Sequence, residues 1–168
     1  GSEMCIETAL QIKQDSLLAA FRNAGKEGKQ VLSDLFGKQV ALYDNITDRV
    51  KSFEDACQVL GISTNVPEVK GLPRKHQKAI IANYKLIVIA EALNEGWKPN
   101  WQDSDEYKYY PWFDMSNPAG VGYSHTSYAA SYAYAYVGSR LCLKNRELAI
   151  YFGQTFTDLF NDSLLLNA

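Results

Sequence analysis

The stretch from residue 79 to residue 94 constrains the fold most, because apolar side chains surround most of the helix that it predicts. These side chains are Ile80, Ile81, Tyr84, Leu86, Ile87, Val88, Ile89, Ala90 and Leu93. A helix with so little polar surface is usually buried on several sides. Gly96 follows the stretch and is expected to end the helix. The other elements of the fold therefore have to cover it.

Two helices are predicted at the start of the chain. Residues 4–36 place apolar side chains on one face of a helix, namely Ile6, Leu10, Leu17 and Phe21. The glycines within residues 24–28 are expected to break this segment in two, and Gly37 is expected to cap the second helix. Residues 38–43 are compatible with a short strand.

Two further helices are predicted on either side of the central one. Ser52 is a suitable N-cap, with an acidic residue three positions later, for a helix that runs to Leu60 and closes at Gly61. A loop with Pro67 and Pro73 follows. The last helix is expected over residues 145–166. Its buried stripe consists of Leu148, Tyr151, Phe152, Phe156, Leu159 and Phe160.

A small antiparallel sheet is predicted before the last helix. Aromatic residues are dense between residues 97 and 113, and residues 109–113 are expected to form the strand that anchors the sheet. Further short strands are expected at 121–124, 130–137 and 140–143. Alternation places three tyrosines on one strand face, Tyr132, Tyr134 and Tyr136. The sequence predicts an α+β fold, with several N-terminal helices, a small sheet and a C-terminal helix.

Length and charge limit the class of protein. The chain has 168 residues and a net charge of −2. We expect an N-terminal helical segment over residues 1–43, with Gly1 and Ser2 interpreted as a cloning remnant, and an α+β ligand-display domain over residues 44–168. No apolar run reaches about 18 residues, so insertion into a membrane is not expected. The first residues have no signal-peptide pattern.

The cysteines and histidines do not suggest a metal site or a disulfide framework. The three cysteines, Cys5, Cys57 and Cys142, are widely separated, and no Cys-x-x-Cys pair occurs. His76 and His125 are also far apart in the sequence. Zinc and other metals need several such side chains at short spacings. We therefore expect no metal and no cofactor.

Residues 116–143 have an unusual composition. Tyrosine, serine, alanine and glycine dominate the segment, and Arg140 is its only charged residue. It contains no Lys, Glu, Gln, Met or Trp, although all five occur elsewhere in the chain. Codons with two free bases and a pyrimidine in the third position cannot encode these five amino acids, and adenine-directed mutagenesis of Asn codons produces such codons. The composition thus fits a diversified segment, and it equally fits a strand pair rich in Tyr and Ala.

Several motifs of the C-terminal half resemble a known family. They are Tyr109-Tyr110-Pro111-Trp112-Phe113, the Gly-Val-Gly-Tyr-Ser segment at residues 120–124, Val137-Gly138-Ser139-Arg140-Leu141-Cys142-Leu143-Lys144, and the helix start Arg146-Glu147-Leu148-Ala149. Together they resemble the variable proteins of diversity-generating retroelements from gut Bacteroides-type bacteria and their phages. In that family, the stretch between the Gly-Val-Gly start and the Val-Gly-Ser-Arg-Leu end differs between copies. The resemblance covers roughly residues 47–165.

The resemblance implies a C-type-lectin-like sheet that displays a hypervariable segment at about residues 123–136. The ligand-binding side chains would be Tyr123, His125, Thr126, Ser127, Tyr128, Ala130, Ser131, Tyr132, Tyr134 and Tyr136. The scaffold beneath them would be Tyr110, Trp112, Phe113, Gly138 and Arg140. Trp112 and Arg140 are expected to be buried. The Tyr- and Ser-rich composition agrees with this interpretation, because adaptable binding surfaces favour both residues.

Three classes of function are compared. The first is a non-enzymatic binding protein that presents this surface to a variable protein or surface ligand. The second is an enzyme that uses His125, Tyr128 and Arg140, for which the sequence has no nucleophile elbow and no phosphate-binding glycine loop. The third is a small phage-encoded protein that sequesters a nucleotide-type signalling molecule, with Arg140 on a phosphate and tyrosines stacked on the base.

The expected partners follow from charge and composition. Aromatic residues at 97–113 could stack nucleic-acid bases, but the charged residues among them include Asp103, Asp105 and Glu106, so no nucleic-acid partner is expected. Self-association into a homo-oligomer stays open. The location is also open between a phage virion and a bacterial cell.

Overall fold

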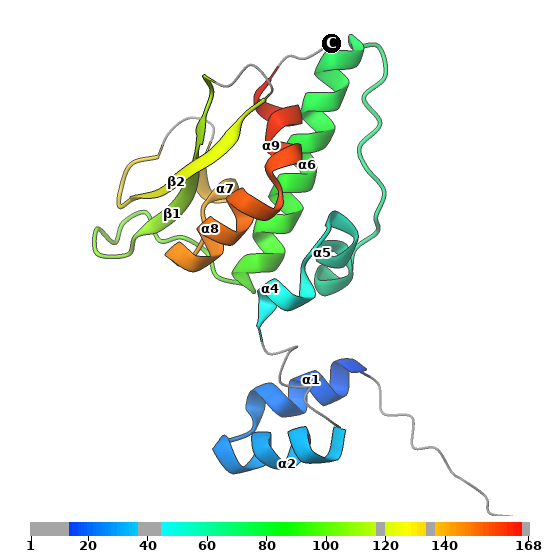
Figure 1. The fold of residues 1–168 in the computed structure, drawn as a ribbon, viewed down its shortest axis with the longest axis vertical. Coiled ribbons are helices and arrows are strands. Elements are labelled where there is room, and N and C mark those ends of the chain that lie inside the picture. Colours follow the sequence, from blue (N-terminus) through cyan, green and yellow to red (C-terminus); the bar gives the residue numbers. More distant parts are fainter. Residues whose placement is uncertain (1–13, 37–44, 117–119, 134–136, 166–168) are drawn as a thin grey trace, which may run out of the picture. The chain divides into compact units, whose positions relative to one another are not determined.

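The structure, a computed structural model, describes residues 14–36, 45–116, 120–133 and 137–165 of the chain. Their helices and strands are labelled in Figure 1. The chain forms two compact units that divide between Asp48 and Arg49. The candidate site lies in the second unit.

The first unit contains two short helices, α1 (Gln14–Asn23) and α2 (Lys26–Phe36). Ala24 and Gly25 separate them, which confirms the predicted break. Phe21 is buried, and the Nζ atom of Lys29 lies 5.1 Å from the centroid of its ring. α2 contains no buried residue. The predicted Gly37 cap and the predicted strand at 38–43 lie outside the described residues.

Two helices, α4 (Ile46–Arg49) and α5 (Phe53–Leu60), precede the central one. Ser52 caps α5 as the sequence predicts, because its hydroxyl accepts a hydrogen bond of 3.1 Å from the backbone N–H of Asp55. Gly61 ends α5 in the left-handed conformation, with a φ of 67°. This conformation favours glycine because it has no Cβ.

The central helix is α6 (Arg74–Asn94). Its buried residues are Ala82, Leu86, Val88, Ile89, Ala90, Ala92, Leu93 and Asn94, which confirms that the predicted helix is covered on several sides. The helix begins five residues before the predicted start. Its first turns, from Arg74 to Lys78, are largely exposed and polar, so the apolar pattern misses them. Glu95 ends α6 with a positive φ of 49°.

The sheet consists of two antiparallel strands, β1 (Lys108–Asp114) and β2 (Gly122–Ala129). β1 confirms the predicted strand at 109–113. β2 begins within the predicted strand at 121–124 and continues to Ala129. Residues 130–133 belong to no strand, contrary to the prediction for 130–137, and residues 134–136 of that range lie outside the described residues.

The strand predicted at 140–143 is replaced by the one-turn helix α7 (Gly138–Leu141) and a single bridge. Leu143 pairs with Tyr109 of β1 through two backbone hydrogen bonds of 2.7 and 3.0 Å. On the opposite side of this segment, the Asn94 side chain donates to the carbonyl of Cys142 at 2.8 Å and accepts from the N–H of Lys144 at 2.9 Å. The amide of Asn94 therefore takes the place of a further strand.

The predicted C-terminal helix at 145–166 consists of two helices, α8 (Arg146–Thr155) and α9 (Thr157–Leu164). Asn145 caps α8 by accepting a hydrogen bond of 2.8 Å from Leu148 N. The break lies at Phe156. The hydroxyl of Thr157 donates to the carbonyl of Gly153 at 2.8 Å, which is the carbonyl that the Thr157 N–H would bond in a continuous helix.

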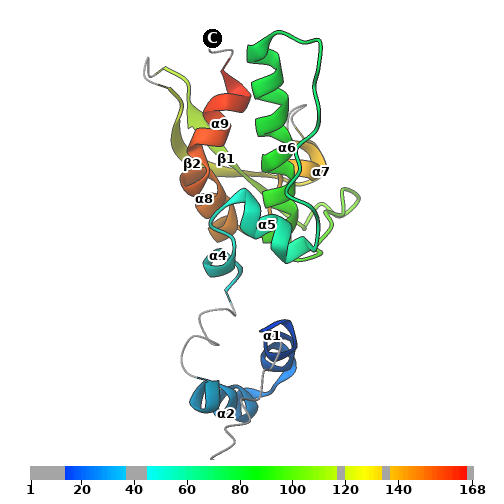
Figure 2. The ribbon, with the colours of Figure 1, turned by 90° about the vertical axis from the view of Figure 1, so that its right-hand side faces the viewer.

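The second unit is layered. α8 packs on both strands and α9 packs on α6, so that α8 and α9 lie between the hairpin and the central helix (Figures 1 and 2). Phe113 of β1 contacts Phe160 of α9 at a ring-centroid distance of 4.4 Å. The predicted α+β fold, with its N-terminal helices, small antiparallel sheet and C-terminal helical segment, is confirmed. The lectin-like character implied by the resemblance is not shown.

Candidate functional site

The strand register decides which side chains of the hairpin can be displayed. Pro111 pairs with Thr126, and Trp112 pairs with His125, so the members of each pair share a face. The next pair is Phe113 with Tyr123, which leaves Ser124 as the extra residue of a β-bulge. The bulge shifts the alternation of β2 by one position.

The inner face of the hairpin, defined as the face toward α8 and α9, contains Tyr123 and Thr126. The hydroxyls of these residues lie 2.8 Å apart, Thr126 is buried and Tyr123 is half-buried. α8 approaches closely at Gly153, where an added Cβ would lie 2.5 Å from the ring of Tyr123 and 2.7 Å from Pro111. The prediction that Thr126 is displayed is wrong, because it pairs with Pro111 on the strand face that packs on α8.

A cluster of three mutually contacting tyrosines lies at the end of the hairpin where β1 begins and β2 ends. Tyr107 and Tyr128 have ring centroids 4.4 Å apart, and Tyr109 lies 6.0 Å from Tyr128 and 6.5 Å from Tyr107. Tyr107 and Tyr128 are 45% and 53% exposed. We call Tyr107, Tyr109 and Tyr128 the tyrosine cluster.

The residues after β2 extend this exposed region. Ser131 is exposed, and Tyr132 is 88% exposed, the largest value among the exposed hydrophobic residues described. A shallow hollow of about 350 Å³ is lined by Tyr110, Tyr128, Ala129, Ala130, Tyr132 and Ala133. Tyr134 and Tyr136 lie outside the described residues. Tyr128, Ala130 and Tyr132 of the predicted binding surface thus border one hollow.

His125 and Ser127 lie on the outer face, opposite to the inner one. The ring of exposed His125 stacks on Trp112, with centroids 5.6 Å apart and planes 12° apart, and its Nδ1 lies 3.1 Å from the hydroxyl of Ser124. Cross-strand pairing places His125 and Tyr128 on opposite faces. The side chains predicted to bind ligand are therefore divided between the two faces of the hairpin.

Two of the predicted scaffold residues of β1, Tyr110 and Trp112, belong to a small aromatic core, in which Trp112 is half-buried and not fully buried as predicted. Tyr110 is buried together with Val137 and Cys142, and Trp97, Trp101, Trp112 and Ala129 pack around them. The indole N–H of Trp101 donates to the hydroxyl of Ser139 at 2.6 Å. Burial raises the pKa of the Cys142 thiol to about 11, so this thiol stays protonated at neutral pH.

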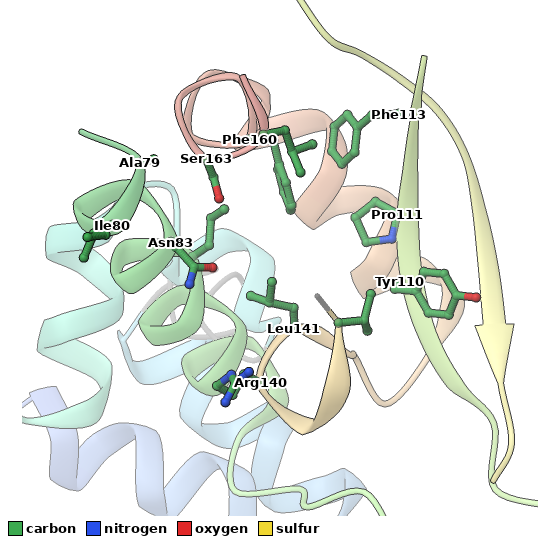
Figure 3. A pocket seen from close by; sticks show the side chains of 13 residues that line it. Ala79, Ile80, Asn83, Tyr110, Pro111, Phe113, Arg140, Leu141, Phe160 and Ser163 are labelled. Carbon is green, nitrogen blue, oxygen red and sulfur yellow. The ribbon is translucent and has the colours of Figure 1, made fainter. Parts of the chain in front are cut away.

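Gly138 and Arg140 were both predicted to belong to the scaffold, and only Gly138 is consistent with that prediction. Gly138 has a positive φ of 48° and starts α7, which is consistent with a scaffold position. Arg140 is exposed on α7, so the expectation that it is buried and ties strands together is wrong. A one-turn helix replaces the predicted strand and turns this side chain outward. Arg140 lines a pocket with Asn83 and Tyr110 (Figure 3).

Two parts of the site were not predicted from the sequence. Tyr107 and Tyr109 complete the tyrosine cluster but precede the variable segment, and only their pairing across the sheet could have indicated them. Lys108 between them is fully buried, and its Nζ donates to the carbonyls of Asp103 and Glu106 and lies 5.5 Å from the ring centroid of Trp101. Lys108 thus fixes the loop from which Tyr107 emerges.

The carboxylate of Glu106 stabilises the same loop before β1. Its carboxylate accepts a hydrogen bond of 2.7 Å from the backbone N–H of Asn100 and lies 3.4 Å from the Nζ of Lys108. The hydrogen bond from Asn100, followed by those from Lys108 and Trp97, lowers the pKa of Glu106 against a partial desolvation. The tyrosine cluster therefore stands next to a loop that is held by named polar contacts.

Neither metal ligands nor sequence relatives identify the site. Across the residues that the structure describes, no three His, Cys, Asp or Glu side chains gather where they could hold a metal ion. Within the same residues no helix is long and apolar enough to cross a membrane. No protein-family model matches the chain, and the searches of curated proteins and of solved structures find no match either.

Proposed function

We propose that this chain is a non-enzymatic binding protein that recognises a protein or surface ligand through the tyrosine-rich end of its hairpin. The observation that carries the proposal is the tyrosine cluster, with Tyr107 and Tyr128 each about half exposed, next to the almost fully exposed Tyr132. Exposed aromatic side chains that lie close together are characteristic of binding surfaces.

The physical properties of this surface support binding. Tyrosine offers a large rigid contact area and a hydroxyl at a low entropic cost, while serine adapts its hydrogen bonds. The ring contacts with Tyr107 and Tyr109 restrict Tyr128 before a ligand arrives, which reduces the entropy lost on binding. The lining of the neighbouring hollow contains no charged residue among those described. Recognition would therefore depend on shape, aromatic contacts and hydrogen bonds rather than on charge.

We also propose that the surface is diversified by a retroelement. The restricted composition of residues 116–143 and the family resemblance support this proposal. If it holds, copies of the gene should differ at exposed positions such as His125, Tyr128 and Tyr132, and should agree at inward-facing Tyr123 and Thr126. The coding DNA tests it: a near-identical repeat that differs at adenines should lie beside a reverse transcriptase gene. A complete genome without such a repeat would exclude diversification.

Binding itself is tested with two display libraries. The first library randomises the exposed positions 125, 128, 131 and 132, and should keep folded members from which binders to an arbitrary protein target can be selected. The matched control library randomises the covered positions Pro111, Tyr123, Thr126 and Gly153, and most of its members should fail to fold. Equal loss of folding in both libraries, or no binders from the first, would contradict the proposal.

The two alternative functions have less support from the arrangement of their residues. His125 and Tyr128 lie on opposite faces of the hairpin and Arg140 lies on α7, so the residues of the enzymatic alternative come from different surfaces. For nucleotide sequestration, Arg140 lines the pocket on one side of Tyr110, and the exposed Tyr128 and Tyr132 line the neighbouring hollow, which Tyr110 also lines. The arginine and the exposed tyrosines therefore line two adjacent cavities and not a single site.

A further inference from the structure

A second cavity lies at the edge of β1 that does not pair with β2, and Tyr110 stands between this cavity and the hollow beside Tyr128 and Tyr132. The pocket has a volume of about 430 Å³ and is enclosed by α6, α7, α9 and β1 (Figure 3). Small-molecule pockets usually measure about 300–1,000 Å³ and combine an apolar lining with a few polar groups. The volume of this pocket falls within that range.

The apolar part of the pocket can hold a hydrocarbon chain or a ring. Leu86, Leu141 and Phe160 line it, and the ring of Phe113 closes one side through its contact with Phe160 at 4.4 Å. Leu86 is fully buried and Phe160 is 6% exposed, so the wall is supported by the core of the unit. These side chains offer contacts to an apolar body but no hydrogen bonds.

The polar part contains three side chains with unused hydrogen-bonding capacity. Within the described residues, the side chains of Asn83, Ser163 and Arg140 form no hydrogen bond or ion pair with the protein. Figure 3 shows Asn83 of α6 and Ser163 of α9 at one end of the pocket, with Arg140 near the opposite end, beyond Leu141. The pocket thus offers a cationic group at one end and neutral polar groups at the other.

The charge balance decides which ligand fits. Arg140 is the only charged residue among the described residues that line the pocket. The nearby Asp162 of α9 is paired with Lys78 of α6 at 2.7 Å. A guanidinium binds a carboxylate with two parallel hydrogen bonds, and one positive charge balances one negative charge. A phosphate monoester carries almost twice that charge and would lack a second cation.

We propose that this pocket binds an amphipathic organic carboxylate, with its apolar body between Leu86, Leu141 and Phe160 and its carboxylate on Arg140. Asn83 and Ser163 would bind a neutral hydroxyl or carbonyl group of the ligand, or water. This binding site is formed by the helical scaffold and does not depend on the proposed display function.

The test uses two probes with the full chain. Anilinonaphthalene sulfonate, a fluorescent aromatic monoanion, should bind at a single saturable site, and decanoate should displace it. Arg140→Gln should weaken the binding of both probes by about tenfold or more, because it removes a charge-assisted hydrogen-bonding partner. Arg146→Gln, at the exposed start of α8, removes the same charge outside the pocket and should change neither affinity.

Two further variants separate this pocket from the tyrosine surface. Ala79→Phe introduces a bulky ring at a position that lines the pocket and should abolish binding of both probes while Arg140 is kept. Tyr132→Ala, in the hollow beside the tyrosine cluster, should leave both affinities unchanged. Circular dichroism and thermal melts establish that each variant is folded. If Ala79→Phe does not fold, the comparison of Arg140→Gln with Arg146→Gln still tests whether the probes bind at this pocket.

Three results would overturn the proposal. The first is that Arg140→Gln and Arg146→Gln have equal effects, or that neither has one. The second is that the fluorescent probe binds without saturation or is not displaced by decanoate. The third is that adenosine monophosphate displaces the probe at lower concentrations than decanoate, which would assign the pocket to nucleotides instead. None of these results would affect the display function, which is tested on other residues.

Discussion

At the scale of single residues, Gly153 controls how closely α8 approaches the sheet. An added Cβ would lie 2.5 Å from the ring of Tyr123 and 2.7 Å from the Cβ of Pro111, which cannot move without shifting β1. Gly153→Ala should therefore lower the free energy of unfolding by about 1–2 kcal/mol, because overpacking outweighs the gain in helix propensity. Urea denaturation measures this difference.

Gly122→Ala is the matched control for this substitution. No atom lies within 4 Å of the Cβ that it would add on β2. Its free energy of unfolding should stay within about 0.5 kcal/mol of the original protein. If the two alanine variants are equally stable, α8 does not pack as closely on Tyr123 as described.

Asn94 is the second residue on which the fold depends locally. It is 6% exposed and bonds both the carbonyl of Cys142 and the N–H of Lys144. Asn94→Ala should cost about 1–3 kcal/mol, because it leaves two backbone groups without these partners. Thermal unfolding of this variant should be compared with that of Asn65→Ala, whose side chain is exposed. Similar midpoints for the two variants would contradict the assigned role.

At the scale of elements, the loop before β1 should respond to acid through Glu106. Its pKa lies below the ordinary value of 4.5, mainly because of the hydrogen bond from Asn100. A lowered folded-state pKa contributes stability that is fully present above the unfolded pKa and is lost as the pH falls through the folded one. Glu106→Gln should therefore melt at a lower temperature than the original protein at neutral pH, and this difference should shrink below a pH of about 4.

The control for the acid response is Glu68→Gln. Glu68 forms an ion pair of 2.6 Å with Lys70, but both side chains are more than three quarters exposed. Exposed ion pairs contribute only about 0–1 kcal/mol. The melting temperature of Glu68→Gln should therefore equal that of the original protein at every pH. A constant difference between Glu106→Gln and the original protein across the series would show that the charge of Glu106 does not act as described.

Local signals predicted the elements that local contacts determine. Ser52 and Gly61 define the ends of α5 through bonds within a few residues, and the apolar residues after Ala79 defined most of α6. The break at Phe156 was missed because the pattern of buried aromatic residues continues through it, while the hydroxyl of Thr157 interrupts the backbone bonding. Periodicity reports which residues are buried, and it does not report such local competition.

The site was predicted less well because it depends on register. The bulge at Ser124 has no glycine or proline to indicate it, yet it places Tyr123 on the same inward face as Thr126, although the two residues are three positions apart. Tyr107 and Tyr109 join the tyrosine cluster only because β1 pairs with β2 at Tyr128. Arg140 was misplaced because α7 replaced the expected strand. The errors on the hairpin concern pairing between strands, and the error at Arg140 concerns the conformation of the segment that follows them.

At the scale of the whole molecule, the second unit contains a core of its own. Val50, Ala56, Leu86 and Phe152 are all fully buried. The start of this unit is also tied to its end, because the hydroxyl of Tyr151 donates to the carbonyl of Val50 at 2.8 Å. The display surface and the proposed carboxylate pocket both lie in this unit. It should therefore fold and bind without α1 and α2.

A chain reduced to residues 45–168 tests this independence. Its melting temperature should stay within about 3 °C of the full chain, the shift that about 1 kcal/mol produces at this size. A shorter chain that begins at Phe53 removes the Val50 acceptor and the Ser52 cap, so it should melt several degrees lower. Loss of cooperative unfolding in the chain of residues 45–168 would mean that the N-terminal helices are needed to complete the core. Equal stability of the two shortened chains would mean that Val50 and Ser52 do not stabilise this unit.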